Sequence, residues 1–379
     1  MAPVEYVLEH FYYGQLNAQG ELRLLAASPG VKTGHVSEAM HEARLPQLNG
    51  TPKGALALVR GKTIPFILVQ AMPTSSSQAL RHFVLLPVDV MRSLGGNLSA
   101  LLTLVHDEAP PFGRTGRTLA LLKLEAEQAA PEAQEDAMIA LMAATRDRLD
   151  VIEALLAAII QSVPIVVQDA PADLVTRLQF IEGLLALLPP PARFGVTFAT
   201  HSMTNNRLEA QIRFMGDEAP PEGALVYHWQ DARVTGKKVK DEYSRFIKSQ
   251  LRLDTGLVLQ QTTALTAVAA WRIKRGDSLA DALKYAAYRL KLDNAVLNSQ
   301  PVATSEVARA LAEDPTLTEE LRAAYVRHLL AFTLALDEMS HADLLAVLVR
   351  GQPDLERVVL QQMNDALVNG KAEAVYKTL

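Results

Sequence analysis

The stretch YYGQLNAQGELRLLAASPGV, residues 12–31, shows how the N-terminal part of the chain folds. Gly14 and the segment from Asn17 to Gly20 predict turns, because glycine and asparagine readily adopt the positive φ angles that tight turns need. The run at residues 21–27 predicts a strand, and the Ser-Pro-Gly that follows ends it. We therefore expect one strand to enter a turn at Gly14 and a second strand to follow.

The composition is that of a globular chain able to bury a large core. It has 379 residues, of which 49% are hydrophobic and 21% are charged, and these are ordinary values. The net charge of −5 gives no overall basic field for nucleic acid. The absence of cysteine excludes disulfides, thiolate catalysis and cysteine-ligated zinc. We expect a cytoplasmic protein, since the start lacks signal-peptide features and the apolar segment 151–160 is too short to span a bilayer.

Strand and helix signals together predict an α+β protein with three domains. The first, residues 1–125, is a strand-rich α+β domain in which the runs 54–61 and 63–71 form a hairpin. Pro65 places the second of these runs at an edge or a bulge, because proline cannot donate a ladder hydrogen bond.

The second domain, residues 131–235, is predicted to be a small α/β domain: helix, strand, helix and three further strands. Its first helix is expected to run over 133–161 on the helical spacing of its apolar residues. The Met-Thr-Asn-Asn segment at 203–206 predicts a hairpin between the first two of the three strands. The polar run RVTGKKVK at 233–240 predicts a flexible linker and a hinge.

The third domain, residues 240–379, is predicted to be all-helical, either a bundle or α-solenoid-like. A Thr-x-x-Glu capping box at 316–319 predicts a helix start, and Gly351 and Gly370 predict helix ends. No fixed period supports a named repeat family. The last residues, 371–379, look like the beginning of another helix, so we expect the sequence to end at a fragment boundary.

The opening stretch resembles the N-terminal domain of bacterial GTPase-associated proteins. The resemblance rests on the Tyr-Gly pair at 13–14, the turn at Gly20 and the strand running into residues 27–30, with the similar arrangement of the later runs 81–87 and 194–202. It covers about the first half of the chain. Members of this group are found beside small GTPases in multi-component systems, some of them assigned to defence. The resemblance implies a small GTPase or another component of such a system as partner, and it makes the chain neither a GTPase nor a GTPase-activating protein.

The loop PPFGRTGRT, residues 110–118, is a candidate phosphate-binding loop. Its glycines, arginines and threonines can surround a phosphate with backbone amides and guanidinium groups. The candidate residues are Gly113, Arg114, Thr115, Gly116 and Arg117. The loop is not a Walker A motif, because no lysine follows its spacer, and a solvated connecting loop is the competing interpretation.

Three groups of polar residues are candidates for a catalytic or metal site. In the segment 35–42 the two histidines are six residues apart and fall on different helix faces, which predicts an exposed helix rather than a metal site. The groups at 106–108 and 201–202 follow apolar runs, but no Gly-x-Ser-x-Gly elbow accompanies them. We therefore predict no catalytic residues, no metal and no cofactor.

The densest basic run offers candidate contacts for an acidic partner or a nucleic acid. Its candidate residues are Arg233, Lys237, Lys238 and Lys240. An exposed linker is the competing interpretation of this run.

Together these observations favour a non-catalytic scaffold or adaptor of a bacterial, GTPase-associated multi-protein system. We expect protein partners, a small GTPase or further copies of the chain among them, rather than a membrane or a nucleic acid. One alternative is a nucleotide- or metabolite-binding regulator, or a hydrolase, that uses the second α/β domain at its strand ends, 168–169 and 200–202. A weaker alternative is a nucleic-acid-binding protein that uses the basic segment 233–248.

Overall fold

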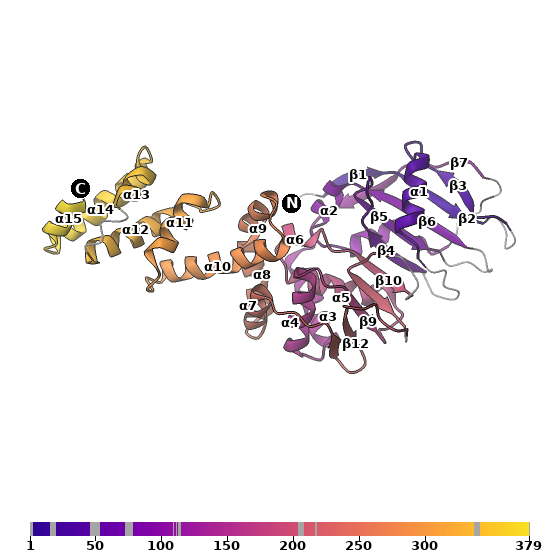
Figure 1. Cartoon of the computed structure of the whole chain (residues 1–379). Coiled ribbons are helices and arrows are strands. Elements are labelled where there is room, and N and C mark those ends of the chain that lie inside the picture. The colour runs from indigo at the N-terminus through magenta and orange to yellow at the C-terminus, as the bar shows by residue number, and fades with distance from the viewer. Residues whose placement is uncertain are drawn as a thin grey trace. The chain divides into compact units, whose positions relative to one another are not determined.

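The computed structural model confirms an α+β fold (Figure 1). It describes residues 3–15, 20–45, 54–72, 79–108, 110, 112, 115–203, 208–216, 218–336 and 342–378. The chain divides into two compact units, Met1–Leu283 and Lys284–Leu379. The first unit contains all the described strands, and the second is helical.

A mixed sheet forms the centre of the first unit, and eleven strands of the described chain belong to it. In spatial order they are β13 (Arg233–Gly236), β12 (Leu225–His228), β9 (Ile165–Gln168), β11 (Ile212–Met215), β10 (Phe198–Ser202), β4 (Ala55–Val59), β5 (Phe66–Ala71), β6 (Leu80–Leu86), β2 (His10–Gly14), β3 (Arg23–Ala27) and β7 (Arg117–Thr118). Strands β12, β9, β11 and β10 are parallel to one another, whereas successive strands in the series β4, β5, β6, β2 and β3 pair in antiparallel fashion. The edge strand β7 is parallel to β3. The predicted strand pair of the opening stretch is thus β2 and β3; part of its connection, residues 16–19, lies outside the described chain. Separately, β1 (Val4–Leu8) pairs with β8 (Leu122–Ala126).

The two halves of the first unit meet where β4 pairs with β10 in antiparallel fashion. The hydroxyl of Thr200 adds two contacts there: it accepts a hydrogen bond from the Leu56 amide (2.9 Å) and donates one to the Leu56 carbonyl (3.0 Å). The expected domains 1–125 and 131–235 therefore share one sheet, and no domain boundary separates them.

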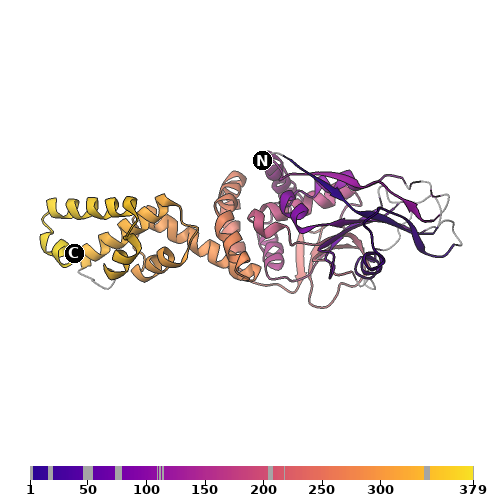
Figure 2. The ribbon, with the colours of Figure 1, turned by 90° about the horizontal axis from the view of Figure 1, so that it is seen from above.

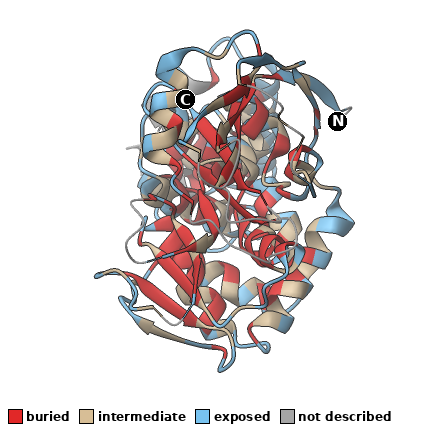
Figure 3. Ribbon diagram, turned by 90° about the vertical axis from the view of Figure 1, so that its right-hand side faces the viewer, coloured by how far each residue is buried: buried red, intermediate tan, exposed pale blue. Residues whose placement is uncertain are grey.

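Helices cover both faces of this sheet, and the buried residues lie along the strands and the inner helix faces (Figure 3). On one face lies α1 (Thr33–Glu42), which is seen end-on in Figure 2. Its Ala39 joins a core that includes the stacked rings of Phe11 and Phe83, 4.7 Å apart. The remaining helices of the first unit are α2 (Val88–Leu94), the 3₁₀ helix η1 (Ser99–Leu104), α3 (Pro131–Ala144), α4 (Leu149–Ile160), α5 (Leu174–Ala186), α6 (Pro190–Arg193), α7 (Glu242–Leu251), α8 (Thr255–Ala264) and α9 (Thr266–Lys274).

Three local predictions in the first unit are wrong. The helix expected over 133–161 is broken into α3 and α4, because Arg146 and Asp147 take positive φ angles of 52° and 56° and reverse the chain. Pro65 does not place its strand at an edge: it precedes β5, which is central and pairs on both sides. The hairpin expected at 203–206 is excluded, because a hairpin joins antiparallel strands whereas β10 and β11 are parallel. Residues 204–206 lie outside the described chain.

The segment predicted as a flexible linker is in part a strand. Residues 233–236 form β13, which pairs with β12 at one edge of the sheet. Helix α7 is held against the same unit, since the Tyr243 hydroxyl donates to the Leu187 carbonyl at 2.9 Å and Lys248 pairs with Glu153 at 2.6 Å. The boundary between compact units falls later, at Leu283, within α10 (Leu279–Leu297).

The second unit is helical, as predicted. After α10 it comprises α11 (Thr304–Glu313), α12 (Glu319–Leu336), α13 (Ala342–Val349), α14 (Pro353–Val368) and α15 (Ala372–Thr378). Gly351 and Gly370 follow helices and take the positive φ angles, 75° and 79°, expected of C-terminal caps. The capping residue of α12 is Thr318 rather than Thr316, since the Thr318 hydroxyl accepts from the Leu321 amide at 3.3 Å.

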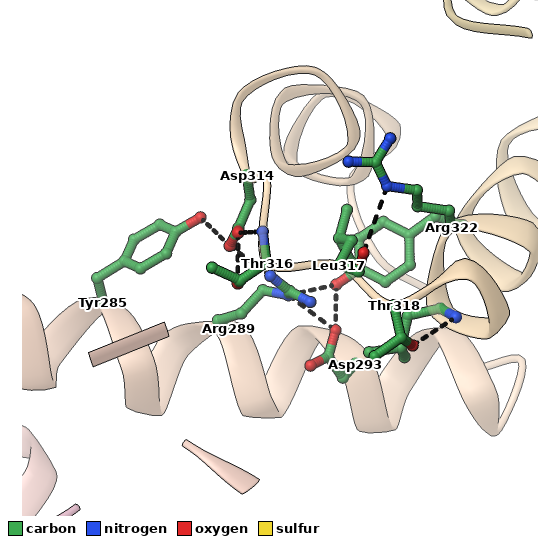
Figure 4. Close-up of polar contacts among 10 residues, drawn as sticks. Tyr285, Arg289, Asp293, Asp314, Thr316, Leu317, Thr318 and Arg322 are labelled. Atoms are coloured by element: carbon green, nitrogen blue, oxygen red, sulfur yellow. Dashed lines mark hydrogen bonds and ion pairs between the residues drawn. The ribbon is translucent and has the colours of Figure 1, made fainter. Parts of the chain in front are cut away.

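A buried ion-pair network fixes the α11–α12 connection to α10 (Figure 4). The Arg289 side chain is 1% exposed and pairs with the fully buried Asp314 and, at 2.9 Å, with Asp293. The Tyr325 hydroxyl donates to Asp293 at 2.6 Å, and the Thr316 amide donates to Asp314 at 2.8 Å. Each acidic group thus accepts several hydrogen bonds, which a buried ion pair needs if it is to offset its desolvation.

Replacing Thr200→Val keeps the shape of the side chain but leaves the Leu56 amide and carbonyl unpaired. Since a buried unpaired backbone group costs about 1–3 kcal/mol, we expect the free energy of unfolding of the first unit to fall by about 2–3 kcal/mol. Urea unfolding followed by tryptophan fluorescence measures this change, because Trp229 and Trp271 both lie in the first unit. Thr118→Val, on the exposed strand β7, is the matched control, and equal losses in both variants would contradict the role of Thr200.

The substitution Asp314→Asn should destabilise the second unit by about 3 kcal/mol, because it leaves the buried Arg289 guanidinium with half of its counter-charge. Urea unfolding followed by far-ultraviolet circular dichroism is the measurement. Asp354→Asn removes one partner of the exposed pair with Arg357 and should cost less than about 0.5 kcal/mol. If Asp314→Asn and Asp354→Asn had the same free energy of unfolding, the buried ion-pair network would contribute little to stability.

Candidate functional site

The carboxyl ends of the parallel strands meet at one edge of the sheet, the usual place for a ligand in such folds. Arg177 of α5 reaches this edge and is only 7% exposed. Its guanidinium donates to the carbonyls of Pro171 (2.6 Å), Ala170 (3.3 Å) and Thr200, and to Nδ1 of His201 (3.0 Å). The side chain therefore occupies the strand ends and ties the end of β10 to the start of α5.

The electrostatics of this edge follow from that burial. Burial lowers the pKa of Arg177 to about 10, although nearby Asp173 acts against the shift, so the guanidinium stays charged at neutral pH. Burial and the Arg177 charge lower the pKa of His201 to about 4. His201 is therefore neutral at pH 7, and because its Nδ1 accepts from Arg177, its proton lies on Nε2.

The predicted ligand residues at this edge are mostly engaged with the protein itself. Gln168 donates through Nε2 to the Glu218 carbonyl at 3.1 Å. Ser202 is buried, and its hydroxyl has no hydrogen-bond partner in the described chain, so it forms no dyad with His201. Asp169 is exposed and takes a positive φ angle of 59° directly after β9. The edge holds the buried Arg177 beside the exposed carboxylates of Asp169 and Asp173, and its described residues do not bring a nucleophile together with a base.

A second polar cluster is buried in the strand-rich half, where β2 pairs with β6. Nε2 of His10 contacts the Ala120 carbonyl at 2.8 Å, and Nδ1 of His10 contacts Nε2 of His82 at 2.9 Å. Since a carbonyl can only accept, the His10 proton lies on Nε2, and His82 must donate to His10. This fixes both tautomers. Burial lowers the pKa of His10. Burial also lowers the pKa of His82, well below its usual value, and the neighbouring His10 and His106 rings add to this shift.

Aromatic contacts complete this cluster. The Tyr12 ring stacks on His82 with centroids 4.4 Å apart, and the His106 ring lies 5.0 Å from His82. The Gln70 amide holds the His106 backbone through two hydrogen bonds of 2.6 and 3.0 Å. Nε2 of His106 is buried and has no hydrogen-bond partner among the residues that the structure describes. Within the described ranges, no cluster of three or more histidine, aspartate or glutamate side chains is suited to hold a metal ion.

The polar helix at 35–42 is α1, and its acidic residue Glu38 has a structural role. The carboxylate of Glu38 accepts hydrogen bonds from the amides of Lys62, Thr63 and Ile64. It thereby fixes the connection between β4 and β5.

The candidate phosphate-binding loop is described only in part. Gly113 and Arg114 lie outside the described residues. Gly116 takes a positive φ angle of 75°, and Arg117 is exposed at the start of β7, the strand at the other edge of the sheet. Thr115 immediately precedes Gly116 and is half-buried. Phosphate binding by this loop stays a prediction.

The candidate basic run begins in the edge strand β13. Arg233 pairs with Asp231 at 2.9 Å, and both side chains are largely exposed. Lys237, Lys238 and Lys240 follow the strand and are also exposed. Lysines at a sheet edge discourage pairing with another chain, so protection of the β13 edge is enough to explain why lysines stand there. A contact of these residues with an acidic partner stays a prediction.

Apolar side chains are most exposed on the last helices of the second unit. Tyr376, Val368, Val347 and Leu360 are 66–83% exposed, and they are four of the five most exposed large apolar residues in the described chain. Leu360 and Leu367 lie seven residues apart on the outer face of α14, opposite the buried Leu355 and Ala366. None of the helices in the described ranges is at once long and apolar enough to cross a bilayer.

Comparison of the sequence with protein-family models and with curated proteins finds no match.

The sequence analysis missed the residues that organise these clusters. Arg177 and Arg193 stand in or beside apolar helical segments, and a lone cation in such a segment is the signal that could have drawn attention to them. The pairing of His10 with His82 could not be predicted from the sequence, since these residues are 72 positions apart and only the β2–β6 register brings them together.

The buried histidines predict that the first unit loses stability in mild acid. In the unfolded chain a histidine titrates near pH 6.5, whereas the folded pKa values of His10, His82 and His201 are lower. The unfolded state therefore binds more protons below about pH 6.5, and the free energy of unfolding should fall as the pH decreases from there toward about 4. Urea unfolding between pH 7.5 and 4.5 measures this slope.

Replacing His82→Phe keeps an aromatic ring against Tyr12 and removes one titrating group, so the slope should become shallower. His41→Phe, at a position with a 60% exposed side chain, should leave the slope as in the parent protein. A slope that His82→Phe does not change would contradict the assignment.

Proposed function

We propose that this protein is a non-catalytic scaffold or adaptor and that its helical second unit binds a protein partner. The proposal rests on the concentration of exposed large apolar side chains on α13, α14 and α15, namely Val347, Leu360, Val368 and Tyr376. An apolar side chain of this size gains about 1.5–3 kcal/mol when it is fully buried. A few such residues are therefore enough to anchor a partner, since a small number of large side chains usually supplies most of the binding energy.

The polar clusters of the first unit support the same proposal. Arg177, Gln168 and Glu38 form most of their hydrogen bonds with backbone groups of the protein itself. Each of them fixes one segment of the fold to another. Such side chains make a rigid platform, which suits a scaffold that presents a binding surface.

The partner that the sequence resemblance implies is a small GTPase or another member of the same bacterial system. The exposed surface itself specifies only a partner with a complementary apolar face. We therefore extend the proposal to a small GTPase on the resemblance alone, and a second copy of the chain is the other partner to be tested.

The double substitution Leu360→Glu and Val368→Glu should abolish partner binding, because it places two charges in the proposed interface. Tagged full-length protein is used to capture partners from its native host, and quantitative mass spectrometry compares parent and variant. We expect the captured partner to fall by about tenfold or more, which corresponds to about 1.4 kcal/mol. Size-exclusion chromatography of the purified protein tests self-association in parallel.

The matched control is Leu253→Glu, which adds a charge at a position that is 72% exposed but lies in the first unit. It should capture the same proteins as the parent. An unchanged set of partners in the double variant would contradict the assignment of the surface. Turnover of a substrate by the purified protein alone would contradict the non-catalytic role.

A further inference from the structure

A small pocket in the first unit lies between the α2–η1 connection, α3 and α5. Its volume is about 80 Å³, and it opens to solvent. Its walls include the methyl groups of Ala129, Ala133, Ala137 and Ala186, and its charged residues are Glu182 and Arg193. One cation and one anion thus share a pocket whose remaining walls are largely apolar.

The cation, Arg193, is 4% exposed and lacks a carboxylate partner in the described chain. Its guanidinium donates to the carbonyls of Leu188 (2.7 Å), Gly95 (3.3 Å) and Ala186 (3.4 Å) and to the side-chain oxygen of Gln134 (2.8 Å). All four acceptors are neutral, so the positive charge is hydrogen-bonded but not neutralised. A guanidinium has five N–H groups, and these four hydrogen bonds engage four of them.

The anion, Glu182, is held in place by Ser99. Its carboxylate accepts from the Ser99 amide at 2.6 Å and from the Ser99 hydroxyl at 2.9 Å. The Leu98 backbone also donates to it. No lysine or arginine of the described chain forms an ion pair with it. Since a carboxylate can accept about four hydrogen bonds, Glu182 retains capacity for a further donor.

We propose that this pocket binds a small zwitterion, an α-amino acid of the size of glycine or alanine. The carboxylate of the ligand pairs with Arg193, and its ammonium group pairs with Glu182. Such charge-assisted hydrogen bonds are stronger than neutral ones. A ligand with only a carboxylate would leave the half-buried Glu182 without a counter-charge, and a ligand with only an ammonium group would leave the buried Arg193 without one, which is the costlier case.

The size of the pocket sets the size of the ligand. At about 10–15 Å³ for each water-sized group, a volume of about 80 Å³ holds roughly five to eight non-hydrogen atoms. Glycine and alanine fall in this range, whereas leucine or phenylalanine exceeds it. The alanine walls can contact a methyl group but offer no partner for a polar side chain. This site is independent of the helical surface proposed above.

Isothermal titration of the full-length protein with glycine and with L-alanine tests the proposal. We expect both to bind, with acetate and ethylamine, which each carry one of the two charges, at least about tenfold weaker. Leucine should also bind more weakly than alanine. Absence of binding by both amino acids would overturn the proposal, and so would acetate or ethylamine binding as tightly as glycine.

Two variants test the pocket directly. Glu182→Gln keeps an acceptor for the Ser99 amide and removes the charge, so it should weaken glycine binding by about tenfold or more. Ala133→Leu fills the pocket from an exposed position and should abolish binding, whereas Ala143→Leu, exposed on the same helix outside the pocket, should not. Glycine binding that survives both Glu182→Gln and Ala133→Leu would place the ligand elsewhere and overturn the assignment.

Discussion

The antiparallel pairing of β4 with β10 is the contact on which the first unit depends. On one side of it lies the antiparallel half of the sheet, and on the other the parallel half. Without this pair, each half would present an unpaired apolar edge, which is a site for aggregation. The Thr200 hydroxyl bonds both backbone groups of Leu56, so one side chain extends the backbone pairing that joins the two halves.

Buried arginines connect the remaining elements by two different means. Arg177 and Arg193 are satisfied by neutral acceptors, mostly backbone carbonyls. Arg289 is paired with two aspartates. A guanidinium can act in both ways because its five N–H groups spread in a plane and it remains charged when buried. The neutral-acceptor arrangement leaves net charge inside the protein, and this charge is available to a ligand at Arg193.

Some local sequence signals predicted local structure, whereas others misplaced it, such as the unbroken helix expected over 133–161 and the cap expected at Thr316. Local signals also failed where distant segments meet. The Ser-Pro-Gly stop after β3 and the caps at Gly351 and Gly370 depend only on nearby backbone conformation, so they were predictable. The parallel pairing of β10 with β11 and the shared sheet depend on partners that no local pattern specifies. The clamp at Arg177 could not be predicted for the same reason, since its acceptors come from two segments brought together by the fold.

The distance along the chain between β4 and β10 has a consequence for synthesis. Leu56 and Thr200 are 144 residues apart, and at about 5–20 residues per second the ribosome needs roughly 7–30 seconds to make the second after the first. During that interval β4, whose five residues are all buried in the finished fold, has no partner on that side. The nascent chain therefore carries an apolar edge for seconds, which makes it a natural client for a chaperone.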